Sequence, residues 1–216
     1  MPIYNEALEG YLRTTFSPED AVLARIREQI PQRGLPAISV RPEEGRFLQF
    51  LAAACGARLA LEIGTLGGYS GVCIARGLAP GGRLITLELE PAHAAVAREH
   101  FTLAGLDQAV ELRVGDAHSL LPDLARIGPF DFIFIDAEKE GYLAYLDWSL
   151  DNLRPGGLLA AHNAFRRGAV LELDADDPRV VATQRFNDRL ARDPRLISSV
   201  FPGGDGIALA VLRPSG

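Results

Sequence analysis

Cysteine, lysine and long apolar runs are scarce in this sequence, and each scarcity excludes a class of protein. Cys55 and Cys73 are the only cysteines among 216 residues and form no C-x-x-C pair. Neither a disulfide framework nor a thiolate metal site is therefore indicated, and buried free thiols are expected. No apolar run approaches the ~20 residues of a membrane span. Lysine occurs once, as Lys139, which makes that residue conspicuous in any motif.

Basic stretches are missing as well. The net charge is −6, from 28 acidic and 22 basic residues without a run of lysine or arginine, which argues against a nucleic-acid partner. The first residues lack a basic segment followed by an apolar one, so no secretion signal is visible and a cytoplasmic location is expected. With 48% hydrophobic and 23% charged residues, the chain is expected to form a single α/β domain over residues 1–216.

The segment before the first strand, residues 1–57, is expected to be a helical cover over a core that spans residues 58–216. Helices are predicted from Asn5 to Phe16, from Ser17-Pro18 to Ile30, and from Arg41-Pro42 to Gly56. In the second, a polar cap followed by proline signals the helix start. The third helix places four apolar side chains on one face: Phe47, Leu48, Phe50 and Leu51.

The stretch L-A-L-E-I-G-T-L-G-G-Y-S-G, residues 59–71, predicts a strand, a tight glycine turn and a helix start. Its first five residues are apolar except for Glu62, which is typical of a strand covered on both faces in a parallel sheet. Gly64, Gly67 and Gly68 allow a sharp turn and the close approach of a ligand. The free N–H groups of the following helix would face that ligand. A small-molecule site is expected here.

The glycine spacing decides between cofactors. A dinucleotide fingerprint needs glycine at the second and fifth positions after Gly64, where Leu66 and Tyr69 stand, so a pyrophosphate ligand is disfavoured. Glu62 would lie poorly beside a phosphate, yet it suits a positively charged amine or sulfonium. The pattern E-x-G-T-x-x-G-Y-S resembles motif I of the S-adenosylmethionine-dependent O-methyltransferases of the catechol and caffeoyl-CoA type. A generic glycine-rich turn is the alternative.

Strand and helix alternate after this turn, which implies right-handed crossovers and a mostly parallel sheet. The resemblance implies an α/β fold of the Rossmann-like class I methyltransferase type, with N-terminal helices and a seven-stranded, mostly parallel sheet whose last strand is antiparallel. The remaining strands are expected at residues 83–88, 110–114, 130–135, 158–161, 196–201 and 207–212, with helices at 70–78, 90–103, 120–127, 142–153 and 179–192.

Two further segments point to the cofactor. Glu88 ends the second strand, where a carboxylate can accept both ribose hydroxyls of a nucleoside; a solvated Glu is the alternative. The turn Gly115-Asp116-Ala117 resembles the adenine-binding loop of the family, although a surface turn also favours Gly and Asp. The cofactor-binding residues expected on this basis are Glu62, Gly64, Thr65, Gly68, Ser70, Glu88, Asp116, Ala117 and Asp136.

A second motif, F-D-F-I-F-I-D-A-E-K at residues 130–139, carries a central strand that delivers Asp136 to the same crevice. It resembles the O-methyltransferase segment in which the Asp binds a divalent metal and the Lys approaches the acceptor hydroxyl. A helix-capping Asp is the alternative. We expect Lys139 to be the general base or proton partner, because burial near a cationic ligand depresses the pKa of a lysine.

The sequence departs from the family at His162-Asn163, where the metal-dependent members usually have Asp-Asn. A site of Asp136, His162 and Asn163 would carry one formal negative charge instead of two, and imidazole suits Mn²⁺, Zn²⁺, Fe²⁺, Co²⁺ or Ni²⁺ better than Mg²⁺. A transition metal on these residues is therefore favoured over magnesium. Two alternatives stay open. His162 is a second general base in a metal-free enzyme, or the site is degenerate and inactive.

Asp205-Gly206 matches the turn that faces the acceptor in the family, although a hairpin explains it equally. The resemblance implies methyl transfer from S-adenosylmethionine to a hydroxyl of a small, catechol-like phenol by a homodimer. Lys139, His162 and Asp136 would be catalytic, and Asp205 would contact the substrate. The alternatives are a nicotinamide-dependent oxidoreductase, which would share the sheet and an acidic Glu88, and a non-catalytic nucleoside-binding protein.

Overall fold

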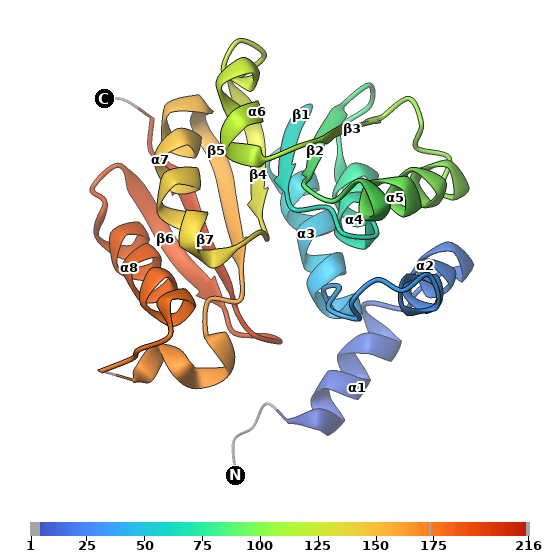
Figure 1. Ribbon diagram of the computed structural model, residues 1–216, viewed down its shortest axis with the longest axis horizontal. Helices are drawn as coiled ribbons and strands as arrows, with labels where there is room; N and C mark the ends of the chain where they lie inside the picture. Colours follow the sequence, from blue (N-terminus) through green and yellow to red (C-terminus); the bar gives the residue numbers. More distant parts are fainter. Residues whose placement is uncertain (1–4, 173, 215–216) are drawn as a thin grey trace.

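A single sheet runs through the centre of the computed structural model, which describes residues 5–172 and 174–214 (Figure 1). Residues 1–4, which enter the expectation about a secretion signal, lie outside this description. Across the described residues the sheet has seven strands in the order β3-β2-β1-β4-β5-β7-β6. Their bounds are β1 Leu59–Ile63, β2 Arg83–Glu88, β3 Val110–Val114, β4 Phe130–Ile135, β5 Leu153–His162, β6 Leu196–Phe201 and β7 Ile207–Leu212.

The direction of the strands agrees with the expected fold. Strands β3, β2, β1, β4 and β5 pair in parallel, whereas β7 runs antiparallel to both of its neighbours, β5 and β6. The strand order reverses between β1 and β4. In open α/β sheets the carboxyl ends of the strands at such a reversal form the ligand-binding crevice.

Residues of the central strands alternate between two hydrophobic clusters, one on each face of the sheet. Phe132 and Phe134 belong to the cluster that contains helices α2 to α5, while Ile133 and Ile135 belong to the cluster that contains α6 to α8. Burial on both faces explains why β4 is almost entirely apolar. The helices are α1 Glu6–Thr15, α2 Ala21–Gln32, α3 Pro42–Ala54, α4 Tyr69–Gly77, α5 Pro91–Leu103, α6 Ala117–Leu124, α7 Tyr142–Asn152 and α8 Pro178–Arg192, with short 3-10 helices η1 Lys139–Gly141 and η2 Arg166–Leu171.

Several element boundaries differ from the expectation. Strand β5 begins at Leu153 instead of residue 158, because the chain is already extended there and pairs with β4 across an irregularity between Phe130 and Phe132. Helix α6 begins at Ala117 because the Asp116 side chain caps it, accepting a hydrogen bond from the His118 N–H at 3.2 Å.

The N-terminal helices also differ in detail. Helix α2 starts after Asp20, whose carboxylate accepts from the Leu23 N–H at 2.9 Å, and it continues through Pro31 to Gln32. A proline in the last turn removes only one helical hydrogen bond. In α3, Leu48 and Leu51 are buried, whereas Phe50 is 60% exposed, so the four apolar side chains expected on one face do not all pack into the core.

The described part of the chain bears on the expected membrane span and on the cysteines. Residues 5–172 and 174–214 contain no helix of the length and apolarity that a membrane crossing requires. Cys55 and Cys73 are both free; Cys73 is buried and Cys55 is half-buried. Burial raises the pKa of the Cys73 thiol to about 12, so this thiol stays protonated and packs as a small apolar group.

Candidate active site

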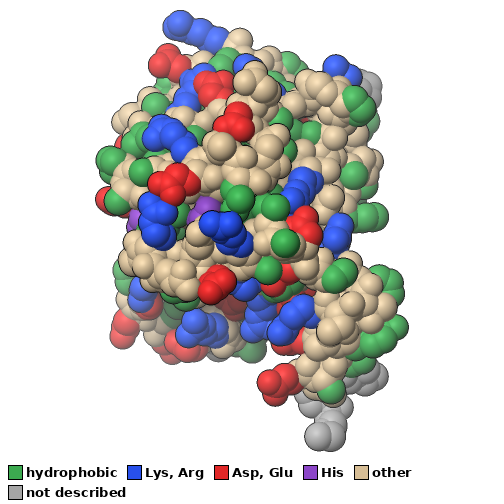
Figure 2. Space-filling view, turned by 90° about the vertical axis from the view of Figure 1, so that its right-hand side faces the viewer, with side chains coloured by type: hydrophobic (Ala, Val, Ile, Leu, Met, Phe, Trp, Pro, Cys, Tyr) green, Lys and Arg blue, Asp and Glu red, His purple; other side chains and the backbone are tan. Residues whose placement is uncertain are grey.

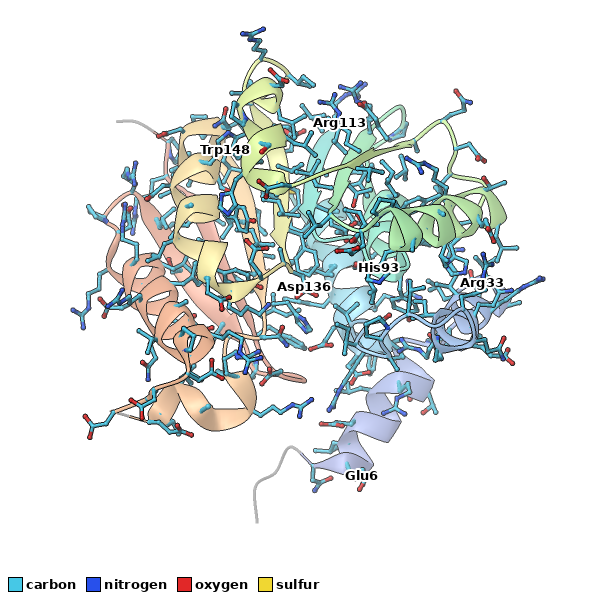
Figure 3. The ribbon with its side chains drawn as sticks, viewed as in Figure 1. Glu6, Arg33, His93, Arg113, Asp136 and Trp148 are labelled. Carbon is cyan, nitrogen blue, oxygen red and sulfur yellow. The ribbon has the colours of Figure 1, made fainter. Side chains whose placement is uncertain are left out.

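A cavity of about 1020 Å³ opens at the carboxyl ends of β1, β4 and β5. Figure 3 marks Asp136 at this edge of the sheet, directly after β4. The cavity is lined by the glycine turn after β1, the segments after β4 and β5, the loop before α3 and the turn before β7. Among the expected site residues, those that line it are Gly64, Thr65, Ser70, Asp136, Lys139, His162, Asn163 and Asp205.

Gly64, directly after β1, packs against the backbone of the residue that follows β4. Its φ of +98° is a left-handed conformation that glycine adopts freely, and a Cβ built there would lie 2.2 Å from the backbone oxygen of Asp136. The Gly64 N–H donates to the Leu87 oxygen at 3.0 Å, and the Asp136 N–H donates to the Ile63 oxygen at 2.8 Å. The turn after β1 is therefore fixed against both neighbouring strands.

Glu88 holds the glycine turn. Its Oε2 accepts hydrogen bonds from the N–H groups of Thr65 and Leu66 at 3.2 and 2.6 Å, and its Oε1 accepts from the Glu90 N–H at 2.9 Å. His93, marked in Figure 3, places Nδ1 3.4 Å from the same Oε1. Glu88 is 6% exposed and lies outside the cavity lining, so its expected contact with a ribose stays a prediction.

Glu62 lies beneath the turn. Its side chain is fully buried, and Oε2 accepts from the Thr86 hydroxyl at 2.6 Å, while Oε1 has no hydrogen-bond partner among the described residues. Burial raises the pKa of Glu62 to about 8, so the carboxyl is largely protonated at neutral pH. The structure does not bring Glu62 into the cavity lining.

The remaining expected cofactor residues lie outside the cavity lining too. Gly68, at φ +83°, leaves room for Phe101, whose ring would be 3.1 Å from an added Cβ. Asp116 is exposed and Ala117 is buried at the start of α6. Their proposed contacts with the cofactor stay predictions.

Lys139 is nearly buried beside Asp136. Its Nζ lies 3.3 Å from Asp136 Oδ1 and 3.1 Å from the Ala137 oxygen, and it also contacts the Tyr142 hydroxyl. Burial lowers the pKa of Lys139, and the negative charge of Asp136 offsets this only in part. The lowered pKa has the direction expected for a lysine that exchanges a proton near neutral pH.

His162 lies between two carboxylates. Its Nδ1 is 3.2 Å from Asp136 Oδ2, and its Nε2 is 3.1 Å from Glu44 Oε1. Burial alone would lower the pKa of His162, but these carboxylates raise it to about 10. Burial would raise the pKa of Asp136, but the charges of His162 and Lys139 hold it well below its usual range.

Glu44 is the residue that sequence reasoning missed. It is 2% exposed in the first turn of α3, and its Oε2 accepts from the Arg41 N–H at 2.7 Å, as in a capping box. A glutamate three residues after the start signal of a helix could have indicated this cap. Nothing local in the sequence indicates its contact with His162, which is 118 residues away.

Asn163 and Asp205 pair on the far side of the cavity. The Asn163 amide donates from Nδ2 to Asp205 Oδ2 at 3.1 Å, and the Arg167 N–H donates to Asp205 Oδ1 at 2.5 Å. Asn163 adopts φ +59°, a conformation that Asn tolerates better than most residues. The Asp205 turn therefore positions the loop after β5.

The expected metal ligands were tested against this arrangement. Asp136 and His162 face each other, His162 is also bonded to Glu44, and Asn163 is bonded to Asp205. In the described ranges, no group of three or more His, Cys, Asp and Glu side chains is arranged to hold a metal ion. Because the donor atoms satisfy one another instead of converging on one point, they do not fit a preformed metal centre.

The comparisons with known proteins identify the family. The O-methyltransferase family model matches residues 13–213. A catechol O-methyltransferase from Niastella koreensis is 41% identical over 215 residues, covering 96% of this chain and 97% of that protein. The structure of the O-methyltransferase from Bacillus cereus in complex with SAH aligns with a TM-score of 0.91 at 40% identity, over 96% of this chain and 97% of that one.

A second solved structure is TomG from Streptomyces achromogenes, an O-methyltransferase involved in tomaymycin synthesis, in complex with SAM. It aligns with a TM-score of 0.90 at 34% identity and covers 96% of both chains. The chain therefore belongs to the O-methyltransferase family. The resemblance drawn from its motifs is confirmed: it is an S-adenosylmethionine-dependent O-methyltransferase with the Rossmann-like class I fold.

Proposed function

We propose that this single-domain enzyme transfers the methyl group of S-adenosylmethionine to a hydroxyl of a small, catechol-like phenol. The observation that carries this proposal is that one cavity contains both the Gly64 turn and the Lys139 cluster. The catechol O-methyltransferase from Niastella koreensis, similar over its whole length, supports the choice of acceptor. Enzymes that transfer a methyl group from a sulfonium need the acceptor oxygen in line with the methyl carbon, and a site with both parts in one cavity meets this need.

The proton of the acceptor hydroxyl goes to Lys139 in this proposal. S-adenosylmethionine would supply the methyl group: a carbon–oxygen bond would form to the phenol as the carbon–sulfur bond breaks, and the electron pair of that bond would stay on sulfur. The neutral amine of Lys139 accepts the hydroxyl proton, a role that its lowered pKa favours. Asp136 then orients the Lys139 ammonium, to which it is bonded, and His162 holds Asp136 in place. Together they position the acceptor.

Two measurements test the reaction. A thermal-shift titration should show stabilisation by S-adenosylhomocysteine and none by NAD, because the glycine spacing disfavours a pyrophosphate. Incubation with S-adenosylmethionine and catechol should then give the O-methyl ether, detected by mass spectrometry. Stabilisation by NAD alone would revive the oxidoreductase alternative, and cofactor binding without turnover on any phenol would favour the non-catalytic one.

A transition metal on Asp136, His162 and Asn163 is the second candidate mechanism, and the mutual pairing of these residues favours the metal-free one. Turnover on catechol is measured after exhaustive EDTA treatment and after adding back Mn²⁺, Zn²⁺, Fe²⁺, Co²⁺, Ni²⁺ or Mg²⁺ in turn. Full activity in EDTA that is lost in His162→Ala supports the metal-free mechanism. Activity restored only by an added ion, with Mg²⁺ accepted by His162→Asp, supports the metal centre.

We also propose a homodimer in the cytoplasm. Helix α1 has no buried residue, and it exposes Leu8, Tyr11 and, just beyond its end, Phe16. Figure 2 shows hydrophobic side chains along this projecting segment. An exposed apolar helix face is a common interface feature. Light scattering should give twice the 23.3 kDa chain mass, whereas a particle of 23.3 kDa at working concentration would contradict the dimer.

A further inference from the structure

Arginine dominates the basic groups of the cavity, and most of these arginines are already paired. Arg27 contacts Glu19 at 2.8 Å, Arg41 contacts Glu9 at 2.8 Å, and Arg179 contacts Asp177 at 2.7 Å. Two further arginines of the lining, Arg166 and Arg167, have no ion pair with any residue that the structure describes. Arg167 is exposed, whereas Arg166 is half-buried.

The Arg166 side chain leaves a donor unsatisfied. Its Nε is buried and has no hydrogen-bond partner within residues 5–172 and 174–214. A guanidinium has five N–H donors in a rigid plane and stays charged at any physiological pH, so a buried N–H without an acceptor is costly. A carboxylate has a matching geometry for such a group, because its two oxygens can accept two parallel N–H bonds from one edge of a guanidinium.

Arg166 also lies close to the proposed reaction centre. Its positive charge is one of the influences that lower the pKa of Lys139, and it acts in the same direction on the Tyr142 hydroxyl. The carboxylates nearest to Lys139 are not free to pair with it, because Asp136 is bonded to His162 and Lys139, and Asp205 is bonded to Asn163. Arg166 therefore has no ion pair with a described carboxylate, although its charge also lowers the pKa of Asp177, which is itself paired with Arg179.

The loop that carries Arg166 is held in a fixed shape. Arg166 and Arg167 adopt φ values of +48° and +53°, which side chains with a Cβ rarely adopt. Backbone hydrogen bonds from Phe165 to the Asp205 oxygen at 3.0 Å and from Ala164 to the Gly206 oxygen at 3.0 Å keep the loop against the turn before β7. The guanidinium is therefore presented to the cavity by a constrained backbone instead of a free surface loop.

We propose that Arg166 binds a carboxylate on the acceptor, so that the preferred substrate is an anionic catechol and not a neutral one. This inference rests on the proposed methyl transfer to a phenol and specifies which phenols fit. The carboxylate of the methionine part of the cofactor has the same chemistry, so the experiment must separate these two sources. Arg166 is a specificity residue in this account and takes no part in the transfer itself.

The test compares 3,4-dihydroxybenzoate with its methyl ester, which has the same catechol ring without the charge. Both are assayed with the wild-type enzyme, with Arg166→Gln, and with Arg185→Gln as a control, since Arg185 is an exposed arginine on α8 outside the cavity lining. Calorimetry measures the Kd of each acceptor in the presence of S-adenosylhomocysteine, and the Kd of S-adenosylhomocysteine itself.

The wild-type enzyme should favour the acid over the ester. In Arg166→Gln, kcat/KM for the acid should fall about 10- to 100-fold while the ester changes less than about twofold, as expected for loss of a charged hydrogen-bonded pair. Arg185→Gln should leave both values unchanged. The proposal is overturned if the wild-type enzyme does not prefer the acid, or if Arg166→Gln lowers kcat/KM for the acid and the ester equally.

Two other outcomes are separable from these. If Arg166→Gln raises the Kd of S-adenosylhomocysteine and leaves the preference for the acid intact, the arginine binds the cofactor and the proposal fails. If the wild-type enzyme methylates neither catechol, the proposed methyl transfer to catechols fails, whatever the role of Arg166. The calorimetric preference for the acid, and its loss in Arg166→Gln, then still decides whether Arg166 is an anion site.

Discussion

The proposed cofactor side of the cavity, around the Gly64 turn, and the proposed acceptor side, around Lys139 and His162, are built in different ways. On the cofactor side, one continuous segment supplies the strand, the turn and the helix, and backbone N–H groups bonded to Glu88 hold its shape. On the acceptor side, the side chains come from α3, β4, β5 and the turn before β7, and they are paired through charge, as in Glu44, His162 and Asp136. Local backbone geometry determines the first side, and long-range ion pairing determines the second.

This difference predicts which kind of substitution should damage each side. A change of shape should damage the cofactor side, because glycine positions leave no space for a Cβ. A change of charge should damage the acceptor side, because its buried groups neutralise one another.

The largest effect is expected on the acceptor side, at Lys139. Lys139→Met should lower kcat by about 10²- to 10⁴-fold, the usual loss on removing a general base, while calorimetry finds the Kd of S-adenosylhomocysteine unchanged. Lys139→Arg places a positive charge beside Asp136, but a guanidinium stays protonated at neutral pH and cannot accept the hydroxyl proton, so the variant should be similarly inactive. Wild-type turnover in Lys139→Arg would show that the position needs only a positive charge.

The next largest effect is expected at Gly64, on the cofactor side. Gly64→Ala places a Cβ 2.2 Å from the Asp136 oxygen at a φ of +98°, so urea denaturation should show a loss of about 2–4 kcal/mol in unfolding free energy. Gly10→Ala, in the exposed helix α1 with nothing within 4 Å of the added Cβ, is the control. It should be neutral or stabilising by up to about 1 kcal/mol. Equal effects in the two variants would refute the tight packing at Gly64.

A smaller effect is expected at Glu88. Glu88→Ala leaves the Thr65 and Leu66 N–H groups without their acceptor, so unfolding free energy should fall by about 1–3 kcal/mol. If Glu88 also binds the ribose of the cofactor, calorimetry should show weaker cofactor binding, by at most about 2–4 kcal/mol. Lower stability with an unchanged cofactor Kd would limit Glu88 to supporting the turn.

The last effect, one of pH dependence, is expected at Glu62. Its pKa in the folded protein, about 8, is above the value of 4.5 for an ordinary glutamate. The folded state therefore holds the proton more tightly, and this stabilisation is complete below pH 4.5 and is lost as pH rises to about 8. Glu62→Gln removes this titration. Urea denaturation from pH 5 to 9 should show the variant gaining stability relative to the wild-type enzyme as pH rises, and a constant difference would contradict a protonated Glu62.

The sequence predicted the local features of the cavity better than the pairings between distant segments. The bounds of β1, β2 and β3 agree with the structure to the residue, because an apolar or alternating run closed by glycine or acid is a local signal. The same locality identified the Gly64 turn and Asp136. The pairing of Glu44 with His162 depends on which helix covers the end of β5, and no residue pattern within either segment carries that information.

The packing of Gly64 on the backbone of Asp136 has a mechanical consequence. Neighbouring strands in a sheet are held about 4.8 Å apart by their ladder of hydrogen bonds, and β1 and β4 are such neighbours. The spacing between the Gly64 turn, the proposed cofactor site, and the residues after β4 is thus set by the hydrogen-bonded sheet and not by the loops. The loop after β5 lies outside this pair of strands, so a change in its charge should alter the choice of acceptor without changing that spacing.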